Sequence, residues 1–299
     1  MAITKEIWIN DIEGNLFKDG TFASMSVNHS SYVDGHLVHV PNAGAAPSVT
    51  ENRSTFPGTV TSRTDTDLNY EIKELSTDPF RIGNAEEVEL SYDKRASILS
   101  ASVAALSEAA DTALLKSWVP TGFTKVLTSG ASTPAHLVSA TGNRKKVTLA
   151  DILEVKKEFD KANIPMQGRC AALDYSMMAE LLDALTANQY NAFLNSADAQ
   201  KGVVGELYGF TFYQRSEVLR TVAAGTSLAT TDAATDGAAG LFWQRDCVGR
   251  ALGTTEVFED PNSPLYYGTV LSCLVRAGGS YTRADKAGVV VLAQATPSA

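Results

Sequence analysis

Cysteine is scarce in this chain, and its three cysteines are far apart. Cys170, Cys247 and Cys273 all lie in apolar surroundings. Three widely spaced cysteines supply neither a disulfide framework nor the close pairs of a zinc site. We therefore expect reduced, buried thiols that behave as small apolar side chains.

The sequence also lacks a long apolar run and an excess of positive charge. No stretch approaches the roughly 18 apolar residues of a membrane-spanning helix, and the first residues carry charges where a secretory signal has an apolar run. These absences predict a soluble protein made in a reducing cytoplasm, with no membrane partner. Acidic residues outnumber basic ones by 34 to 25, which gives a net charge of −9. Tight, charge-driven nucleic-acid binding needs clustered Lys and Arg and is disfavoured, although a surface close to nucleic acid is still permitted.

Signatures of common active sites are absent as well. The chain has no GxSxG, HExxH or GxxxxGK[ST] pattern. Gly202, Gly205 and Gly209 have the wrong spacing for a dinucleotide-binding loop, and a role as helix N-cap accounts for Asp174. We expect no enzymatic activity, no cofactor and no metal site.

What the chain does contain begins with an alternating segment at residues 59–75, TVTSRTDTDLNYEIKEL. Leu68, Tyr70 and Ile72 point one way, with the period of two that a β-strand has. Residues 59–64 are rich in Thr and Val, and we expect them to pair with residues 68–73 across an Asp-Thr-Asp turn. An isolated two-stranded hairpin is marginal in water. The apolar side of this ribbon therefore needs a partner, either the rest of this chain or another copy of it.

The same segment imitates the spacing of a calcium-binding loop, with oxygen-bearing side chains at positions 65, 67, 69 and 71. Such a loop needs Gly at its sixth position and Glu at its twelfth. Tyr70 and Ser76 occupy those positions here, and the flanks look like strands. The ribbon is the better interpretation.

The strongest helical pattern spans residues 92–117, where apolar residues recur every three or four positions from Tyr92 to Leu114. A helix of this span is about 39 Å long at 1.5 Å per residue, enough to cross a domain. Residues 1 to about 50 look instead like an extended arm, with a short helix near 5–14 and a strand at 36–41. We expect contacts outside its own fold to hold an arm of this kind.

The second half reads as an α/β unit followed by β structure. Thr148 and Asp151 resemble a capping box at the start of a helix, residues 168–173 read as a buried strand, and Asp174 caps the next helix. A strand is predicted within 202–218, an exposed loop or hairpin at 221–240, and buried structure at 241–252. The tail, 266–292, is predicted to hold two strands joined near Gly278-Gly279 and a short last strand.

The order of these parts resembles the major capsid proteins of tailed bacteriophages, whose fold is shared with encapsulin shells. ALDYSMMAELLDAL (172–185) is similar to the family's strand-then-helix unit, and GELYGFTFYQRSEV (205–218) to the strand after a Gly-x-x-x-Gly-Phe turn. YGTVLSCLVRAGG (267–279) looks like the return strand. The resemblance implies an α+β phage major-capsid fold. Its parts would be an N-terminal arm at 1–52, an extended β-hairpin loop at 53–78, a peripheral domain at 79–147 with a spine helix at 92–117, an axial domain at 148–255, and return strands of the peripheral domain at 256–299.

The resemblance also implies that the ribbon lies on the next subunit, against that copy's spine helix or peripheral sheet. The residues expected at this subunit interface are Leu68, Tyr70, Ile72, Lys73, Trp8 and Tyr92. Some relatives form a covalent Lys–Asn bond between subunits, for which Lys73 and Asn262 are conceivable partners. A salt bridge or a solvated Lys73 is the favoured interpretation.

The function implied is a major capsid protein that assembles into an icosahedral head around the phage genome. Its partners would be pentamers and hexamers of the same chain, scaffolding and portal proteins, and enclosed double-stranded DNA bound without sequence specificity. The protein would be assembled in the host cytoplasm and reside in the virion. Two alternatives stay open, an encapsulin-type cargo compartment and a soluble α/β enzyme with a β-hairpin flap.

Overall fold

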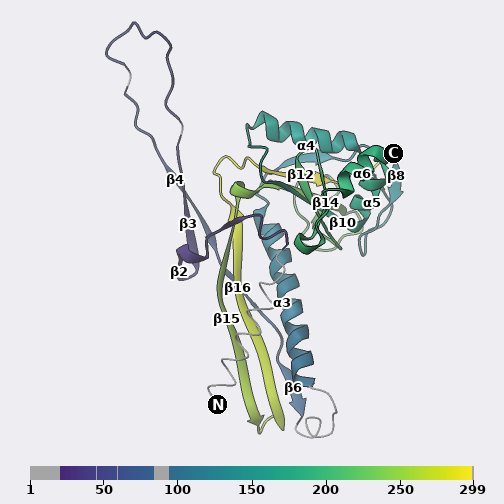
Figure 1. Cartoon of the computed structure of the whole chain (residues 1–299). Helices are drawn as coiled ribbons and strands as arrows, with labels where there is room; N and C mark the ends of the chain where they lie inside the picture. The colour runs from purple at the N-terminus through teal and green to yellow at the C-terminus, as the bar shows by residue number, and fades with distance from the viewer. Residues whose placement is uncertain (1–20, 45, 59, 84–93, 298–299) are drawn as a thin grey trace.

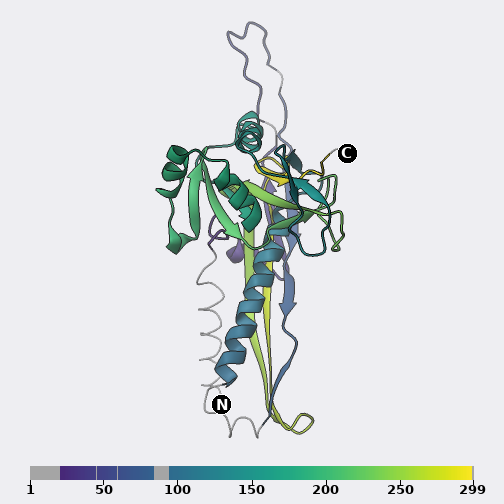
Figure 2. The ribbon, with the colours of Figure 1, turned by 90° about the vertical axis from the view of Figure 1, so that its right-hand side faces the viewer.

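The computed structural model describes residues 21–44, 46–58, 60–83 and 94–297. A long helix and a long two-stranded ribbon form an elongated spine region below a rounded sheet domain, and a loop projects on the opposite side (Figure 1). Seen from the side, spine and loop extend in opposite directions from the sheet domain (Figure 2). Within these residues, no helix is both long and apolar enough to cross a membrane.

The spine region is built on helix α3 (Lys94–Trp118) and strands β15 (Val248–Ser263) and β16 (Gly268–Tyr281). The five-stranded sheet has the order β1 (Val27–Asn28), β15, β16, β5 (Lys73–Ser76), and β6 (Phe80–Gly83) also pairs with β16. One face of this sheet covers α3, and the shared core contains Val103, Leu106, Val257, Cys273 and Val275. The predicted helix is confirmed over the described part of its span.

Trp118 fixes the top of the helix to the sheet domain. Its ring is completely buried, and its indole N–H donates to the carbonyl of Gly249 at 2.9 Å. The ring also lies 5.3 Å from the ring of Trp243 in the sheet domain. A large buried aromatic with a satisfied N–H anchors both elements at one point.

The prediction of two strands joined at Gly278-Gly279 is wrong, because β16 runs through both glycines without a turn. The reason is close packing rather than a bend. A Cβ at Gly279 would lie 2.4 Å from Leu114 Cδ1 and 2.9 Å from the carbonyl oxygen of Gly249. Glycine in a strand marks either a bend or a close approach, and here it lets α3 approach the sheet.

The sheet domain is a seven-stranded sheet with helices beside it. The strand order is β11 (Val203–Leu207), β12 (Phe210–Arg215), β10 (Arg169–Asp174), β14 (Gly237–Gln244), β17 (Val289–Ala293) and β7 (Thr124–Leu127), with β13 (Leu219–Thr221) also on β14. The helices are α4 (Leu149–Lys161), α5 (Tyr175–Asp183) and α6 (Ala187–Leu194). Apolar clusters on both faces bury the central strands.

Local sequence signals account for most of these elements. Thr148 and Asp151 form the predicted capping box, and Asp174 caps α5 by accepting from the backbone N–H of Met177 at 2.7 Å. The predicted strand at 168–173 is β10, and all of its residues are buried. The loop predicted at 221–240 is shorter than expected, because β14 already begins at Gly237.

The last strand differs in partner from its prediction. We expected residues 256–299 to return to the peripheral domain, yet β17 pairs with β14 and β7 in the sheet domain. All five β17 residues are buried. β7 likewise comes from the segment expected in the peripheral domain. The apolar run predicted that this segment forms a strand, but it did not predict which sheet the strand joins.

A small third sheet carries the projecting loop. It joins β2 (Val33–Asp34), β3 (Leu37–Asn42) and β4 (Thr66–Glu71). The predicted pairing of 59–64 with 68–73 is wrong, because β4 pairs with β3 from Leu37↔Glu71 to Asn42↔Thr66. β3 provides Val38, which is fully buried, whereas residues 59–64 offer almost no apolar side chains.

The remaining short elements are β8 (Ser132–Pro134), β9 (Asn143–Lys145) and three short 3-10 helices, η1 (Ser30–Tyr32), η2 (Ala199–Lys201) and η3 (Arg245–Cys247). The three cysteines are buried and free of disulfides, which confirms the interpretation of them as small core residues. Burial raises the pKa of the Cys170 thiol to about 12 and that of Cys247 to about 11. Both thiols therefore stay protonated at neutral pH.

Candidate assembly surfaces

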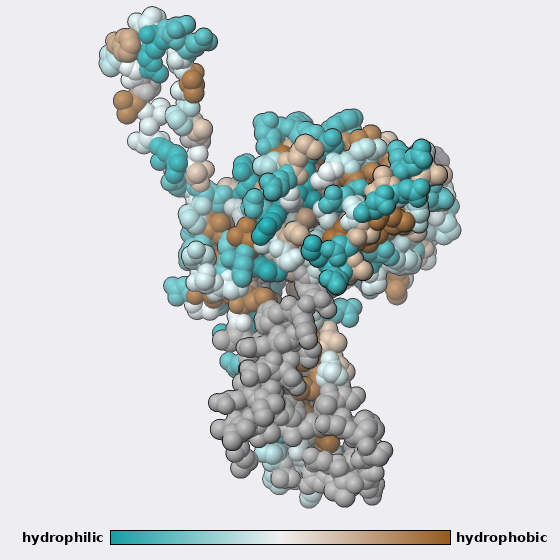
Figure 3. Space-filling model, in the orientation of Figure 1, coloured by the Kyte–Doolittle hydropathy of each residue, from teal (hydrophilic) through white to brown (hydrophobic). Residues whose placement is uncertain are grey.

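The projecting loop, residues 43–65, extends far from the rest of the chain (Figure 1). Its large apolar side chains are almost fully exposed, with 96% of Val49, 77% of Phe56 and 95% of Val60 accessible to solvent. Figure 3 shows brown apolar groups at separate points along this loop. Exposed apolar side chains on an extended segment are typical of a surface that another molecule covers.

Polar contacts fix the stem of the loop. The Asp65 carboxylate accepts from Nε of Arg63 at 2.6 Å, from Nη2 of the same side chain at 2.9 Å and from the backbone N–H of Gly44 at 2.9 Å. The bonds from Arg63 and then Gly44 hold the pKa of Asp65 below its usual range. This clamp joins the two sides of the stem, so the loop leaves the body from a defined point.

A second pair lies one step closer to the body. Nδ1 of His39 is 2.8 Å from Oδ2 of Asp67 across the β3–β4 pair. The hydrogen bond with Asp67 raises the pKa of this exposed imidazole above its ordinary value. Asn42 Oδ1 accepts from the backbone N–H of Ala284 at 3.1 Å, which ties the stem to the segment after β16.

The ribbon residues predicted at a subunit interface have different positions in the single chain. Tyr70 and Ile72 are buried in a cluster with Val38 and Ala251, and the Tyr70 hydroxyl is 3.0 Å from Nδ1 of His29. The chain itself therefore covers much of the face expected to need a neighbour. Leu68 is half-buried, and its contact with another subunit stays a prediction. Trp8 and Tyr92 lie outside the described residues.

Lys73 does not lie on the projecting loop. It is exposed on β5, opposite Ala277 of β16. The loop itself, residues 43–65, contains two arginines and no lysine. The projecting loop therefore supplies no lysine amine for a Lys–Asn bond.

The far end of the spine region presents a second exposed apolar surface, which sequence reasoning missed. In the turn between β15 and β16, 82% of Leu265, 53% of Tyr266 and 78% of Tyr267 are exposed. Turns usually carry Gly, Asn, Asp or Ser. Three large apolar residues in a turn are the signal that could have identified this surface from the sequence.

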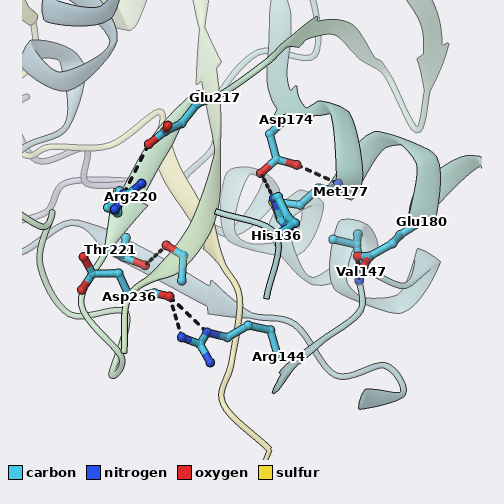
Figure 4. Close-up of polar contacts among 11 residues, drawn as sticks. His136, Arg144, Val147, Asp174, Met177, Glu180, Glu217, Arg220, Thr221 and Asp236 are labelled. Carbon is cyan, nitrogen blue, oxygen red and sulfur yellow. Dashed lines mark hydrogen bonds and ion pairs between the residues drawn. The ribbon is translucent and has the colours of Figure 1, made fainter. Parts of the chain in front are cut away.

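Buried charged groups connect the loops of the sheet domain (Figure 4). The Arg144 guanidinium donates five hydrogen bonds to four backbone carbonyls, those of Thr141, Asn143, Ala234 and Asp236. Only 3% of Arg144 is exposed. This side chain holds the β8–β9 connection against the segment that precedes β14.

A histidine and an aspartate form a second buried contact in the same region. His136 Nε2 lies 2.8 Å from Oδ2 of Asp174, and the two side chains are 11% and 1% exposed. Figure 4 shows the Asp174 carboxylate between the imidazole and the backbone N–H of Met177. These residues lie far apart in the sequence, and no local pattern pointed to His136. Within the described residues, no group of His, Cys, Asp or Glu has the arrangement of a metal site.

Several solved structures share this architecture, although no sequence comparison finds a relative. No protein-family model matches the chain, and none of the curated proteins is similar to it in sequence. Among solved structures, a chain of the capsid of Ralstonia phage GP4 is 14% identical, with 96% of this chain and 92% of that chain covered and a TM-score of 0.63.

Two further structures agree at full length. A chain of the capsid of cyanophage Pam1 is 10% identical, with 94% of this chain and 93% of that chain covered and a TM-score of 0.64. A virus-like particle from Pyrococcus furiosus is also 10% identical, with 97% of this chain and 99% of that chain covered and a TM-score of 0.57. The spine region, the sheet domain and the projecting loop together have the phage major-capsid fold.

Proposed function

We propose that this chain is a major capsid protein, which assembles with copies of itself into a closed icosahedral head around a bacteriophage genome. The observation that carries the proposal is the full-length match to chains of phage capsids. The projecting loop supports it independently, since its exposed apolar side chains have the character of a surface that other copies cover. The function is structural, with no catalysis.

The physical basis of assembly is contact between unlike surfaces. The projecting loop of one copy donates Val49, Phe56 and Val60, and a different surface of the next copy receives them. A contact between two different surfaces closes rings when its rotation permits, here the pentamers and hexamers of the shell. The turn at Leu265–Tyr267 offers another contact at the far end of the spine region. Many modest contacts made at once by every subunit give a stable shell.

The remaining roles follow from the same proposal. The arm lies within residues 1–52, and the projecting loop is the extended loop. The spine region serves as the peripheral domain. The sheet domain, which takes β7 and β17 from the segments 79–147 and 256–299, serves as the axial domain. The net charge of −9 suits a shell that encloses DNA without binding it tightly. Scaffolding and portal proteins are the further partners, assembly takes place in the host cytoplasm, and the final location is the virion.

Electron microscopy of the purified full-length chain over a concentration series tests the proposal. We expect rings at low concentration and closed round particles at high concentration. Sedimentation velocity in the same samples should show a single large species that replaces the rings as the concentration rises. Material that stays monomeric or dimeric at every concentration and salt condition, although folded, would contradict the proposal.

A compartment that encloses protein instead of DNA is the second candidate, and the match to the Pyrococcus furiosus virus-like particle favours keeping it. The content of particles isolated from the native host separates the two. Ultraviolet absorbance dominated by nucleic acid supports the phage head. Particles that hold a second protein in fixed proportion and no DNA support the compartment.

A further inference from the structure

His136 occupies an unusual place in the sheet domain. It lies in the connection of residues 135–142 between β8 and β9, and its imidazole reaches across to the first turn of α5 (Figure 4). Nε2 is hydrogen-bonded to Asp174, and the ring lies edge-on against Tyr175 with centroids 5.5 Å apart. Nδ1 is buried and has no hydrogen-bond partner among the residues that the structure describes. The imidazole is therefore held by one hydrogen bond and by its surroundings.

The charged groups that face the imidazole are mainly negative. Asp174 is in direct contact, and Glu180 of α5 and Glu217, between β12 and β13, add negative potential. Basic groups weaken the negative potential of the two glutamates, because Arg220 Nε lies 3.3 Å from Glu217 and the charge of Lys146 acts on Glu180. Asp174 also accepts a hydrogen bond from the backbone N–H of Met177 at the start of the helix.

These surroundings decide which form of the imidazole is preferred. Burial by itself would lower the pKa of His136, but the hydrogen bond with Asp174 and the charges of Asp174, Glu180 and Glu217 outweigh it. The net effect raises this pKa above its ordinary value. The cation is therefore the form that the closed arrangement favours.

Other contacts also hold the connection, including the hydrogen bond from Arg144 Nη1 to the carbonyl of Thr141. Ala135 donates to the carbonyl of Gly142 at 2.9 Å, and Thr141 donates to the carbonyl of Ala234 at 2.9 Å. Leu137 is buried in the core, whereas the next residue, Val138, is 74% exposed. The His136–Asp174 contact joins this connection directly to α5.

We propose that protonated His136 acts as a pH-dependent latch, which fixes the connection 135–142 to the start of α5 and weakens when the imidazole loses its proton. The latch is a property of the single chain and does not depend on shell formation. A group with a raised pKa contributes its stabilisation fully below the pKa of the open state, about 6.5 for histidine. That contribution is lost as the pH rises through the higher value of the closed state. The connection should therefore open more often in mildly alkaline solution.

Hydrogen–deuterium exchange of the full-length chain measures this opening. Peptides that cover 135–142 are followed from about pH 6 to about pH 9, which brackets the ordinary pKa of histidine. The test variant is His136→Gln, because a glutamine amide can still donate to Asp174 but carries no charge. The exchange rate of wild type is divided by that of the variant at each pH, because this ratio cancels the pH dependence of the intrinsic amide exchange reaction.

We expect wild type to open less often than His136→Gln at the acidic end and equally often at the alkaline end. Each unit by which the pKa of the closed state exceeds that of the open state corresponds to about a tenfold change in the opening equilibrium. The matched control is His39→Gln, which removes the other histidine–aspartate pair and should leave exchange in 135–142 unchanged. A ratio that stays constant across the pH range overturns the proposal. The proposal is also overturned if His39→Gln changes the pH dependence of exchange in 135–142 as His136→Gln does.

Nuclear magnetic resonance gives a second readout. The chain has four histidines, so loss of one ring signal in His136→Gln identifies its resonance. That signal should titrate above the ordinary histidine value of about 6.5. Titration below it means that burial dominates, and the latch is then excluded.

Discussion

Phe56 is the largest exposed apolar side chain of the projecting loop, and replacing it with serine separates assembly from folding. In the single chain, 77% of its surface is accessible. The Phe56→Ser chain should fold as the wild type does, because substitutions on exposed surfaces usually change the free energy of unfolding by less than about 0.5 kcal/mol. If another copy covers the side chain in a shell, assembly should suffer instead.

The size of the effect follows from the exposed surface. Complete burial of a Phe side chain is worth roughly 1.5–3 kcal/mol relative to leaving it in water. About three quarters of the side chain is still available, so each loop contact should lose roughly 1–2 kcal/mol. A difference of that size changes an equilibrium constant by a factor of roughly 5–30. The concentration at which particles first appear should rise by a similar factor.

Light scattering over a concentration series measures this threshold, and electron microscopy identifies the particles. Thermal unfolding of the dilute, unassembled chain shows whether Phe56→Ser and wild type have the same unfolding temperature. Phe56→Leu is the matched control, since it keeps most of the apolar surface and should stay within a few-fold of wild type. Ser48→Ala on the same loop should have no effect.

Two results would refute the reasoning. An unchanged assembly threshold for Phe56→Ser would mean that no other molecule buries this side chain. A lower unfolding temperature for the dilute variant would mean that Phe56 stabilises its own chain, in which case any assembly defect would be indirect.

Three further predictions test the interior and the chemistry of the chain. Arg144→Met should lower the free energy of unfolding by about 2–4 kcal/mol, measured by urea denaturation, because four backbone carbonyls, among them the buried one of Asp236, lose their donor. Arg144→Lys should restore only part of the loss, and equal stability for Met and wild type would contradict this role. The thiols of Cys170, Cys247 and Cys273 should react with a thiol reagent only after unfolding, since all three are buried with raised pKa values; rapid modification of the native chain would show an exposed thiol. Assembled particles boiled in detergent should run as a single band near 31.8 kDa, because Lys73 lies on β5 and the projecting loop has no lysine; a ladder of multiples would reveal a covalent bond.

Sequence reasoning succeeded where a local signal fixes local structure. The apolar period of α3, the capping box of Thr148 and Asp151, and the N-cap Asp174 each depend on residues within a few positions of one another. Apolar β runs likewise identified β10 and β17. The order of these parts was enough to indicate the fold.

Sequence reasoning failed where a strand or a side chain pairs with a partner that lies far away in the sequence. Residues 59–64 have the composition of a strand, but β3 outcompetes them for β4 because Val38 can be fully buried there. The sequence around Gly279 predicted a turn. Glycine is needed there because Leu114 of α3 approaches the strand closely, and Leu114 lies far away in the sequence. The His136–Asp174 contact joins residues that only the fold brings together.

The position of β17 has a consequence for synthesis of the protein. This strand lies between β14 and β7, so one side of β14 and all of β7 remain unpaired until the ribosome has added residues 289–293. A nascent chain thus exposes the edges of β14 and β7, which domains that fold early on the ribosome avoid. A chain truncated before residue 289 therefore lacks the strand that joins β14 to β7.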